Sequence, residues 1–251
     1  MRIHLTVSLM VGIQFAARAS GGPSPAPAPP AAPPHARIAQ LYRSNCAGCH
    51  GEKGDGNGPK SHFLVPRPRD FAEGEFKIRS TAPGDIPTQE DLERTVQRGV
   101  PGTAMPAFGQ RLSTEETRAV IEVLRSFSSR FDEDGPGMPL EFSPAPGQNA
   151  GTLARGRAIY DRLDCTRCHG PSGRGDGQQA GQLRDATCFL TRPRDFSIRA
   201  LYKGGATPED IFRTLSTGMD GTPMTALRAR LPDAERWDLA YFISSLARSS
   251  P

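Results

Sequence analysis

Apolar residues recur at helical spacing along much of the chain, and the helices that they predict come in two matching sets. A leading helix is predicted before residue 46 and another before residue 165, with these apolar faces: Ile38, Leu41 and Tyr42, then Ile159 and Leu163. A closing helix ends each set, one after the capping box Ser113-x-x-Glu116 and one over 232–247. Their inward-facing residues are Val120, Val123, Leu124 and Phe127, then Trp237, Ala240, Tyr241 and Ile243. No stretch alternates as a strand would, so the expected fold class is all-α.

Residues 37–130 and 153–248 pass through the same series of features, which identifies an internal repeat. The run Arg67-Pro68-Arg69-Asp70-Phe71 returns intact at 192–196, and Gly54-Asp55-Gly56 returns as Gly175-Asp176-Gly177. Each repeat also predicts a short middle helix, over 91–97 and over 208–217, the latter opened by Thr207. The expected organisation is a signal sequence (1–19), a Pro/Ala-rich tether (20–35), a first domain (36–131), a Pro- and Gly-rich linker (132–151) and a second domain (152–251).

The amino terminus is typical of a secretory signal. Arg2 precedes a short apolar run, and Ala17-Arg18-Ala19 offers small residues for cleavage after Ala19. The run is short for a membrane span, so we expect no transmembrane segment once it is removed; retention as an uncleaved anchor stays open. The net charge of the 251 residues is +4 and no run of like charge occurs, which argues against a nucleic-acid partner.

The chemistry of the chain is carried by two pentapeptides, Cys46-Ala47-Gly48-Cys49-His50 and Cys165-Thr166-Arg167-Cys168-His169. C-x-x-C-H is the spacing of covalent haem attachment: two thiols on one helical turn add to one porphyrin, and the following histidine binds its iron. A zinc ribbon would pair its C-x-x-C units within one small module, whereas these lie 119 residues apart. The prediction is two covalent haem c groups in an exported, periplasmic protein. The leftover Cys188 is interpreted as a small buried side chain, although a reactive or intermolecular thiol stays open.

A second iron ligand is predicted to be a methionine in each repeat. Met105 lies 55 residues after His50, and Met224 lies 55 residues after His169. This equality survives unequal loop lengths in between, as expected if a shared metal ties both ends of each repeat together. The second repeat holds no histidine besides His169, which excludes a local bis-histidine site there.

Two other residues are possible iron ligands. His62 has no counterpart in the second repeat, so a solvated loop histidine is the preferred interpretation. Met219 aligns with Val100 rather than with Met105, and it ranks behind Met224 for that reason. The predicted iron ligands are therefore His50 with Met105 and His169 with Met224.

The leading helix, C-x-x-C-H, methionine loop and closing helix of each repeat resemble the class I cytochrome c domain, and the two in tandem resemble the periplasmic dihaem cytochromes c over residues 36–248. The resemblance implies two domains, each wrapped around one haem, with first and last helices that cross near Tyr42 and Tyr160. The glycine usual four residues before that aromatic is Gly156 in the second repeat but Ile38 in the first. A looser crossing is therefore expected in the first domain.

Arginines are expected to bind the haem propionates, because a planar guanidinium donates two parallel hydrogen bonds to a carboxylate. The candidates come from the repeated pentapeptide: Arg67, Arg69, Arg192 and Arg194. The alternative, ordinary solvated surface charges, stays open for each of them. The prolines at 66, 68 and 193 mark rigid loops that could present a carbonyl to the histidine ring.

Function follows from two fully ligated haems. With both axial positions occupied no substrate site remains, so the expectation is an electron-transfer protein rather than an enzyme, passing one electron per haem between redox protein partners whose identity stays open. The alternatives are a cytochrome subunit bound permanently to an oxidoreductase or membrane complex, and a dihaem peroxidase. The second repeat has 15 basic and 12 acidic residues from residue 135 on, so its haem is expected to have the higher potential.

Overall fold

The structure is a computed structural model that describes residues 34–135 and 137–247. The predicted signal sequence and nearly all of the predicted tether lie outside the described residues. Of the helices that are described, none is long and apolar enough to cross a membrane.

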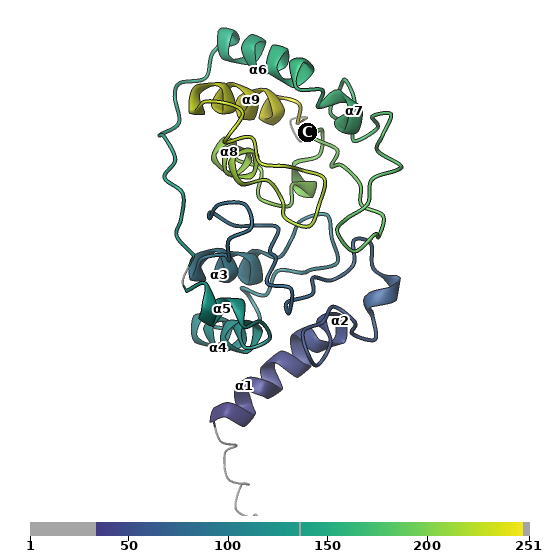
Figure 1. The fold of residues 1–251 in the computed structure, drawn as a ribbon, viewed down its shortest axis with the longest axis vertical. Helices are drawn as coiled ribbons and strands as arrows, with labels where there is room; N and C mark the ends of the chain where they lie inside the picture. Colours follow the sequence, from purple (N-terminus) through teal and green to yellow (C-terminus); the bar gives the residue numbers. More distant parts are fainter. Residues whose placement is uncertain (1–33, 136, 248–251) are drawn as a thin grey trace, which may run out of the picture. The chain divides into compact units, whose positions relative to one another are not determined.

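The described chain is all-α, as predicted, because its regular elements are helices and its only β feature is a single bridge between Arg184 and Leu190. The first repeat supplies α1 (Pro34–Tyr42), α2 (Gly48–His50), α3 (Gln89–Arg98), α4 (Thr114–Arg125) and α5 (Arg130–Glu133). The second supplies α6 (Ala150–Arg162), α7 (Thr166–His169), α8 (Pro208–Thr217) and α9 (Asp233–Ser245). A π-helical turn over Arg43–Ala47 joins α1 to α2, and 3-10 turns lie at Ser61–Phe63 and Arg199–Leu201 (Figure 1).

The predicted helix starts agree with the observed caps. The Ser113 hydroxyl accepts from the Glu116 amide at 3.1 Å, and the Glu116 carboxylate accepts from the Ser113 amide at 3.0 Å, so the capping box of α4 is confirmed. Thr207 caps α8, which has proline in its first turn. Helix α4 ends at Arg125, so Phe127, predicted as part of its buried face, packs against the core from just beyond the helix.

Each repeat builds its own hydrophobic core. In the first, α4 is covered by α1 and α3, and the core includes Tyr42, Val120 and Ile121. In the second, α9 is buried almost throughout between α6 and α8, and Trp237 stacks on Phe212 with ring centroids 4.1 Å apart. Two separate cores give the molecule two domains.

The two helix crossings differ as the resemblance implied. Gly156 of α6 lies directly on the backbone of α9, where a Cβ atom would overlap the Asp238 carbonyl oxygen. Ile38 stands at the matching place in α1, and α1 contacts α4 less extensively than α6 contacts α9. A side chain at a crossing keeps two helix axes further apart than a glycine does, and α1 is also the shorter helix.

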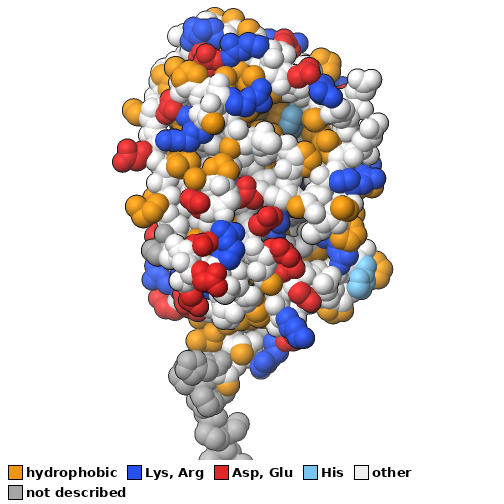
Figure 2. Space-filling model, viewed as in Figure 1, with side chains coloured by type: hydrophobic (Ala, Val, Ile, Leu, Met, Phe, Trp, Pro, Cys, Tyr) orange, Lys and Arg blue, Asp and Glu red, His pale blue; other side chains and the backbone are white. Residues whose placement is uncertain are grey.

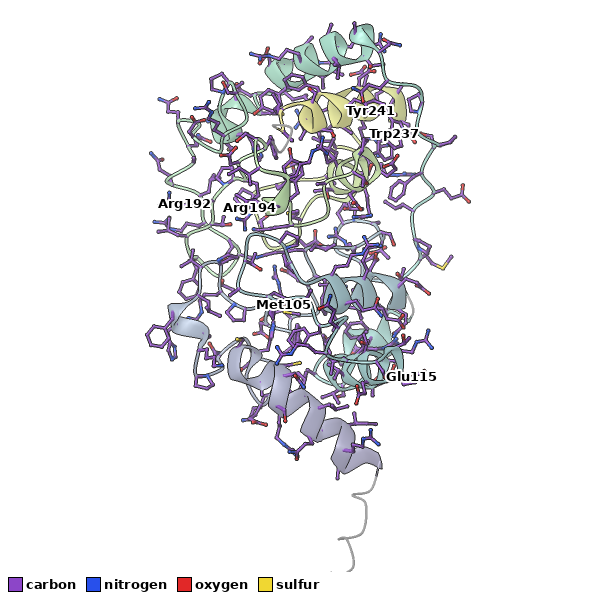
Figure 3. All side chains as sticks on the ribbon, turned by 180° about the vertical axis from the view of Figure 1, so that it is seen from behind. Met105, Glu115, Arg192, Arg194, Trp237 and Tyr241 are labelled. Carbon is purple, nitrogen blue, oxygen red and sulfur yellow. The ribbon has the colours of Figure 1, made fainter. Side chains whose placement is uncertain are left out.

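The linker between the domains forms hydrogen bonds with both of them. Near its start, the Leu140 amide donates to the Ser80 carbonyl at 2.8 Å. Further on, the Trp237 indole donates to the Ser143 hydroxyl at 3.1 Å, and the Tyr241 hydroxyl donates to the Pro146 carbonyl. Figure 3 shows Trp237 and Tyr241 side by side on α9. The linker therefore lies against α9 and helps to fix the second domain.

Candidate haem sites

Both C-x-x-C-H motifs lie on short helices that follow the leading helix of their domain. Cys46 lies in the π-helical turn and Cys49 in α2, while Cys165 caps α7 and Cys168 lies within it. All four thiols are partly buried and free of disulfide bonds. Burial raises the pKa of both Cys46 and Cys165 to about 11, so these thiols are protonated at neutral pH in this apolar setting.

The chain after each motif turns back sharply and is tied to the leading helix. Gly51 and Gly170 adopt φ of 82° and 76°, a region that favours glycine. Their carbonyls accept hydrogen bonds from the hydroxyls of Tyr42 at 2.8 Å and Tyr160 at 2.7 Å. Each tyrosine therefore links the leading helix of its domain to the turn that follows the motif helix.

The repeated Arg-Pro-Arg-Asp-Phe segment positions the histidine of its own domain. In the first domain, His50 Nδ1 lies 3.0 Å from the Arg69 carbonyl, and the imidazole stacks on Phe71 with centroids 4.4 Å apart. A ring held at Nδ1 in this way leaves Nε2 for a metal. Burial lowers the pKa of His50, and the carbonyl opposes that lowering in part, so the ring is neutral at pH 7.

His169 is positioned similarly but held less firmly. Phe196 stacks on its ring at 4.4 Å, as Phe71 does on His50. Burial lowers the pKa of His169 to about 4, and the carbonyl of Arg194 acts in the opposite direction. Its Nδ1 is nevertheless buried without a hydrogen bond of normal geometry among the described residues. The sequence predicted a carbonyl from the proline-containing loops, but it did not predict the stacked phenylalanines.

Each predicted methionine ligand stands at the end of a loop closed by threonine. The Thr103 hydroxyl donates to the Val100 carbonyl at 2.7 Å and accepts from the Met105 amide at 3.1 Å. In the second domain the Thr222 hydroxyl makes the same two bonds, to the Met219 carbonyl at 2.7 Å and from the Met224 amide at 3.2 Å. The Gly-Thr-x-Met pattern thus builds one loop geometry twice.

A cavity of about 250 Å³ opens in the second domain, and His169, Met224 and both cysteines of the motif line it. The rest of its wall is largely apolar, with Leu163, Ile211, Leu215, Leu227 and Ile243. Met219 also lines it, so the competing methionine is in reach of the same space. The structure thus brings residues that lie 55 positions apart to one cavity.

Buried basic side chains gather where the two domains meet. Burial and the positive charge of neighbouring bases lower the pKa of Lys77 to about 8 and of Lys203 to about 7, and Lys203 is only 7% exposed. Arg69 and Arg194 contribute to that positive potential. Within the described chain, the side chains of Lys77, Arg194 and Lys203 form no ion pair or hydrogen bond. Buried cations are costly without anions, so this cluster suits carboxylate groups.

The four candidate arginines are not equivalent. Arg192 and Arg194 lie on one loop (Figure 3) and line the cavity of the second domain. Arg69 lies at the domain interface, where its guanidinium donates to the Asp220 carbonyl at 3.1 Å. Arg67 donates to the Ser61 hydroxyl at 2.9 Å and lies over the Phe189 ring at 4.6 Å. Lys77 and Lys203, which align after the repeated pentapeptide, complete the basic cluster.

Two further residues lie away from both sites. Cys188 is exposed with a φ of 63°, so the interpretation of a buried side chain was wrong: a tight turn places it at the surface. His62 is exposed in the 3-10 turn, as expected of a solvated loop histidine. On the face in Figure 2, acidic and basic side chains are interspersed.

Comparisons with known proteins identify each half of the chain separately. A family model described as "Cytochrome C oxidase, cbb3-type, subunit III" matches residues 33–122, and one described as "Cytochrome c" matches residues 153–247. The chain is 26% identical over 227 residues to "Cbb3-type cytochrome c oxidase subunit CcoP" of Azospirillum sp. (strain B510). That alignment covers 82% of this chain and 60% of the relative, so the chain spans less than two thirds of the relative's length.

A solved structure extends the comparison to both halves together. A chain of the Kuenenia stuttgartiensis reducing HAO-like protein complex superimposes with a TM-score of 0.81 at 37% identity. The match covers 84% of this chain and 96% of that one. The tandem arrangement, and not only each domain, is therefore shared with that protein.

Proposed function

Because this chain belongs to the cytochrome c family, with two of its domains in tandem and one covalent haem c in each, we propose that it is a periplasmic one-electron carrier between a respiratory or dehydrogenase donor and a terminal acceptor. The observation that carries the proposal is the cavity of the second domain, whose wall holds both His169 and Met224. The first domain repeats the same histidine support and the same methionine loop. Two equivalent redox centres suit transfer of electrons better than chemistry on a substrate.

The residues of the second site fit a haem in shape and in charge. Its largely apolar wall suits the macrocycle, and the unpartnered bases Arg194 and Lys203 suit the carboxylates that a haem carries. When bound, the haem iron supplies reversible one-electron oxidation and reduction. The thiols of Cys46, Cys49, Cys165 and Cys168 would hold the two haems, and His50, Met105, His169 and Met224 would bind the irons. Arg69, Lys77, Arg194 and Lys203 would bind their carboxylates.

The protein's own groups then tune and protect these centres. The Arg69 carbonyl orients the His50 ring, the stacked Phe196 supports the His169 ring, and burial keeps both rings neutral, which is the form that binds a metal. Methionine as the other ligand places both centres on the higher-potential side of the haem range. If His50 and Met105 hold one iron and His169 and Met224 hold the other, no ligand position would be left for peroxide, which would set the carrier apart from a dihaem peroxidase.

A second candidate function is a permanent subunit of an oxidoreductase complex. It is favoured by the names of the two relatives, one an oxidase subunit and the other a chain of a protein complex. The exposed Phe63 and Val65, at 84% and 73% exposure, offer apolar contact area on the first domain. Purification from the native host separates the two: a carrier elutes alone, whereas a subunit elutes in fixed ratio with its partners.

The assignment of the iron ligands is tested by spectroscopy on the holoprotein. Mass spectrometry and haem staining after denaturing electrophoresis should show two haem additions per chain. Met105→Ala and Met224→Ala should each remove about half of the weak near-infrared absorption of ferric His/Met haem, because each domain has one ligand. Met219→Ala is the matched control and should leave that absorption unchanged; the reverse pattern for Met219 and Met224 would mean that the loop assignment is wrong.

A further inference from the structure

The first domain contains a segment that the second lacks, and it lies against the methionine loop of the second domain. Eleven positions separate Lys77 from Thr88, but only four separate the matching Lys203 from Thr207. The segment 78–87 is therefore seven residues longer than its counterpart 204–206, and it carries Arg79, which is buried to 1% exposure. A fully buried arginine needs an anion and several acceptors.

Arg79 finds its anion in the other domain. One guanidinium nitrogen, Nη2, donates to the Asp220 carboxylate at 2.8 Å and to the Thr217 carbonyl at 3.0 Å. Its remaining groups donate within its own domain, to the carbonyls of Phe76 and Ala82, both at 3.1 Å. The Arg79 Nε and Nη1 groups therefore anchor the side chain in the first domain, and Nη2 binds the second domain.

Asp220 is held from the first domain at every oxygen that it presents. Besides Arg79, the Gly84 amide donates to its second carboxylate oxygen at 3.0 Å, and Arg69 donates to its backbone carbonyl at 3.1 Å. All three donors come from the first domain. Loss of one partner from a buried ion pair strongly destabilises the folded protein, because the remaining charge is left without a partner. Movement of Asp220 away from these donors would have a similar cost, so the contact restrains Asp220 tightly.

Asp220 lies in the turn that aims Met224. The Thr222 amide donates to the Met219 carbonyl at 3.1 Å across a four-residue turn, and Gly221 at its third position has a φ of 68°. Thr222 then holds the Met224 amide, and the Met219 amide donates to the Met224 carbonyl at 2.9 Å. Restraint on Asp220 thus passes to Met224 through two short chains of hydrogen bonds.

The matching turn of the first domain obtains its rigidity in another way. There the sequence is Val100-Pro101-Gly102-Thr103, with Gly102 at a φ of 68°. Proline at the second position and glycine at the third preset a type II turn without outside help. In the second domain Asp220 stands in place of that proline, so its turn lacks the restraint that proline gives. Asp220 is also the residue that Arg79 and the Gly84 amide of the first domain contact.

We propose that Arg79 is a positioning residue acting across the domain interface: with the Gly84 amide and Arg69 it braces the turn at Asp220, so that the first domain holds the Met224 ligand of the second haem in place. Met105, whose turn has a proline, needs no such brace. The proposal rests on the proposed function, specifically on Met224 as an iron ligand. It makes the second haem, and not the first, dependent on the contact between Arg79 and Asp220.

The test uses the holoprotein in a Met105→Ala background, where the near-infrared absorption of ferric His/Met haem comes from the second haem alone. Arg79→Gln and Asp220→Asn should each raise the fraction of second haem without methionine ligation about tenfold. The potential of that haem should fall, by about 59 mV for each tenfold change in its one-electron equilibrium. Arg157→Gln, which removes an arginine of the exposed pair with Asp161 on α6, is the matched control and should change neither quantity.

A rescue variant separates bracing from mere loss of stability. Arg79→Gln combined with Asp220→Pro copies the turn of the first domain and should restore methionine ligation without the ion pair. Unchanged absorption and potential in both Arg79→Gln and Asp220→Asn would overturn the proposal, and so would failure of the proline variant to restore them. If instead Met224→Ala itself leaves the absorption intact, the ligand assignment is at fault and not the brace.

Discussion

The two domains build the histidine side of their sites almost identically, yet they differ in the loops that connect those sites. In both domains the tyrosine hydroxyl donates to the carbonyl of the turn glycine, and the phenylalanine stacks on the histidine with ring centroids 4.4 Å apart. The unequal segments are 78–87 in the first domain and the run between Gly177 and Arg192 in the second. Each reaches the other domain: Arg79 binds Asp220, and Phe189 lies under Arg67 at 4.6 Å. The candidate haem site is therefore similar in the two domains, whereas the loops of unequal length form contacts between the domains.

Removal of one haem has the largest expected effect. It tests whether each domain retains its haem independently of the other. Cys165→Ala with Cys168→Ala should reduce the mass by one haem group and abolish one of the two redox waves, because no thiol remains for attachment in the second domain. The first haem should stay attached, since its own motif is intact. Mass spectrometry of the purified chain is the measurement, and Cys188→Ala is the control, which should retain both haems because Cys188 is exposed and outside both sites.

Acid sensitivity should distinguish the two histidines once their haems are absent. In the Cys165→Ala/Cys168→Ala variant, His169 has a pKa of about 4 when folded and 6.5 when unfolded, so the unfolded chain binds the extra proton first. The stability contributed by the neutral ring is fully present above pH 6.5 and is lost as the pH falls from there through about 4, by roughly 3 kcal/mol in all. Urea unfolding at several pH values measures it, and adding His169→Gln should remove that dependence.

The matching variant of the first domain sharpens the contrast. Cys46→Ala with Cys49→Ala exposes the titration of His50, whose Nδ1 has a carbonyl partner at 3.0 Å that opposes the lowering of its pKa. A smaller loss of stability in acid is expected there. Equal losses in both variants would show that the carbonyl contact makes no difference between the two rings.

A mutation at the helix crossing of the second domain should have an effect of intermediate size on stability. Gly156→Ala places a Cβ atom against the Asp238 carbonyl and should destabilise the second domain by about 2 kcal/mol, measured as the shift of its thermal or urea transition. Gly147→Ala, where the structure has open space around the added atom, is the control and should be nearly neutral. A neutral Gly156→Ala would mean that α6 can move away from α9 as α1 does from α4.

The sequence predicted the features that depend on residues close together in the chain, such as the starts of helices. The capping box at Ser113 and the proline start of α8 both depend on residues within a few positions, and they are as expected. The Arg79–Asp220 pair could not be predicted in this way, because 141 positions separate its members and only the docking of two folded domains brings them together.

One sequence match was misleading. The identical letters Gly54-Asp55-Gly56 and Gly175-Asp176-Gly177 suggested equivalent positions, but the amides that donate to the histidine carbonyls are those of Gly56 and Gly175, both at 2.9 Å. The true register is shifted by two residues, so the additional residues of the second domain follow Gly177. Backbone hydrogen bonds to the motif helix fix this register, and residue letters alone do not reveal them.

The smallest expected effect concerns the order of the two potentials. The excess of basic residues in the second repeat predicts that its haem has the higher potential, since positive charge favours the reduced iron. The structure limits the size of that difference, because the buried bases nearest the interface come from both domains: Arg69 and Lys77 from the first, Arg194 and Lys203 from the second. Exposed charges elsewhere are screened beyond about 8 Å at physiological salt. A redox titration of the wild type and of His169→Ala, in which the first haem keeps both proposed ligands, assigns the waves. If the wave that survives in His169→Ala is the higher one, the charge difference does not set the order, and electrons have no electrostatic preference for leaving from the second haem.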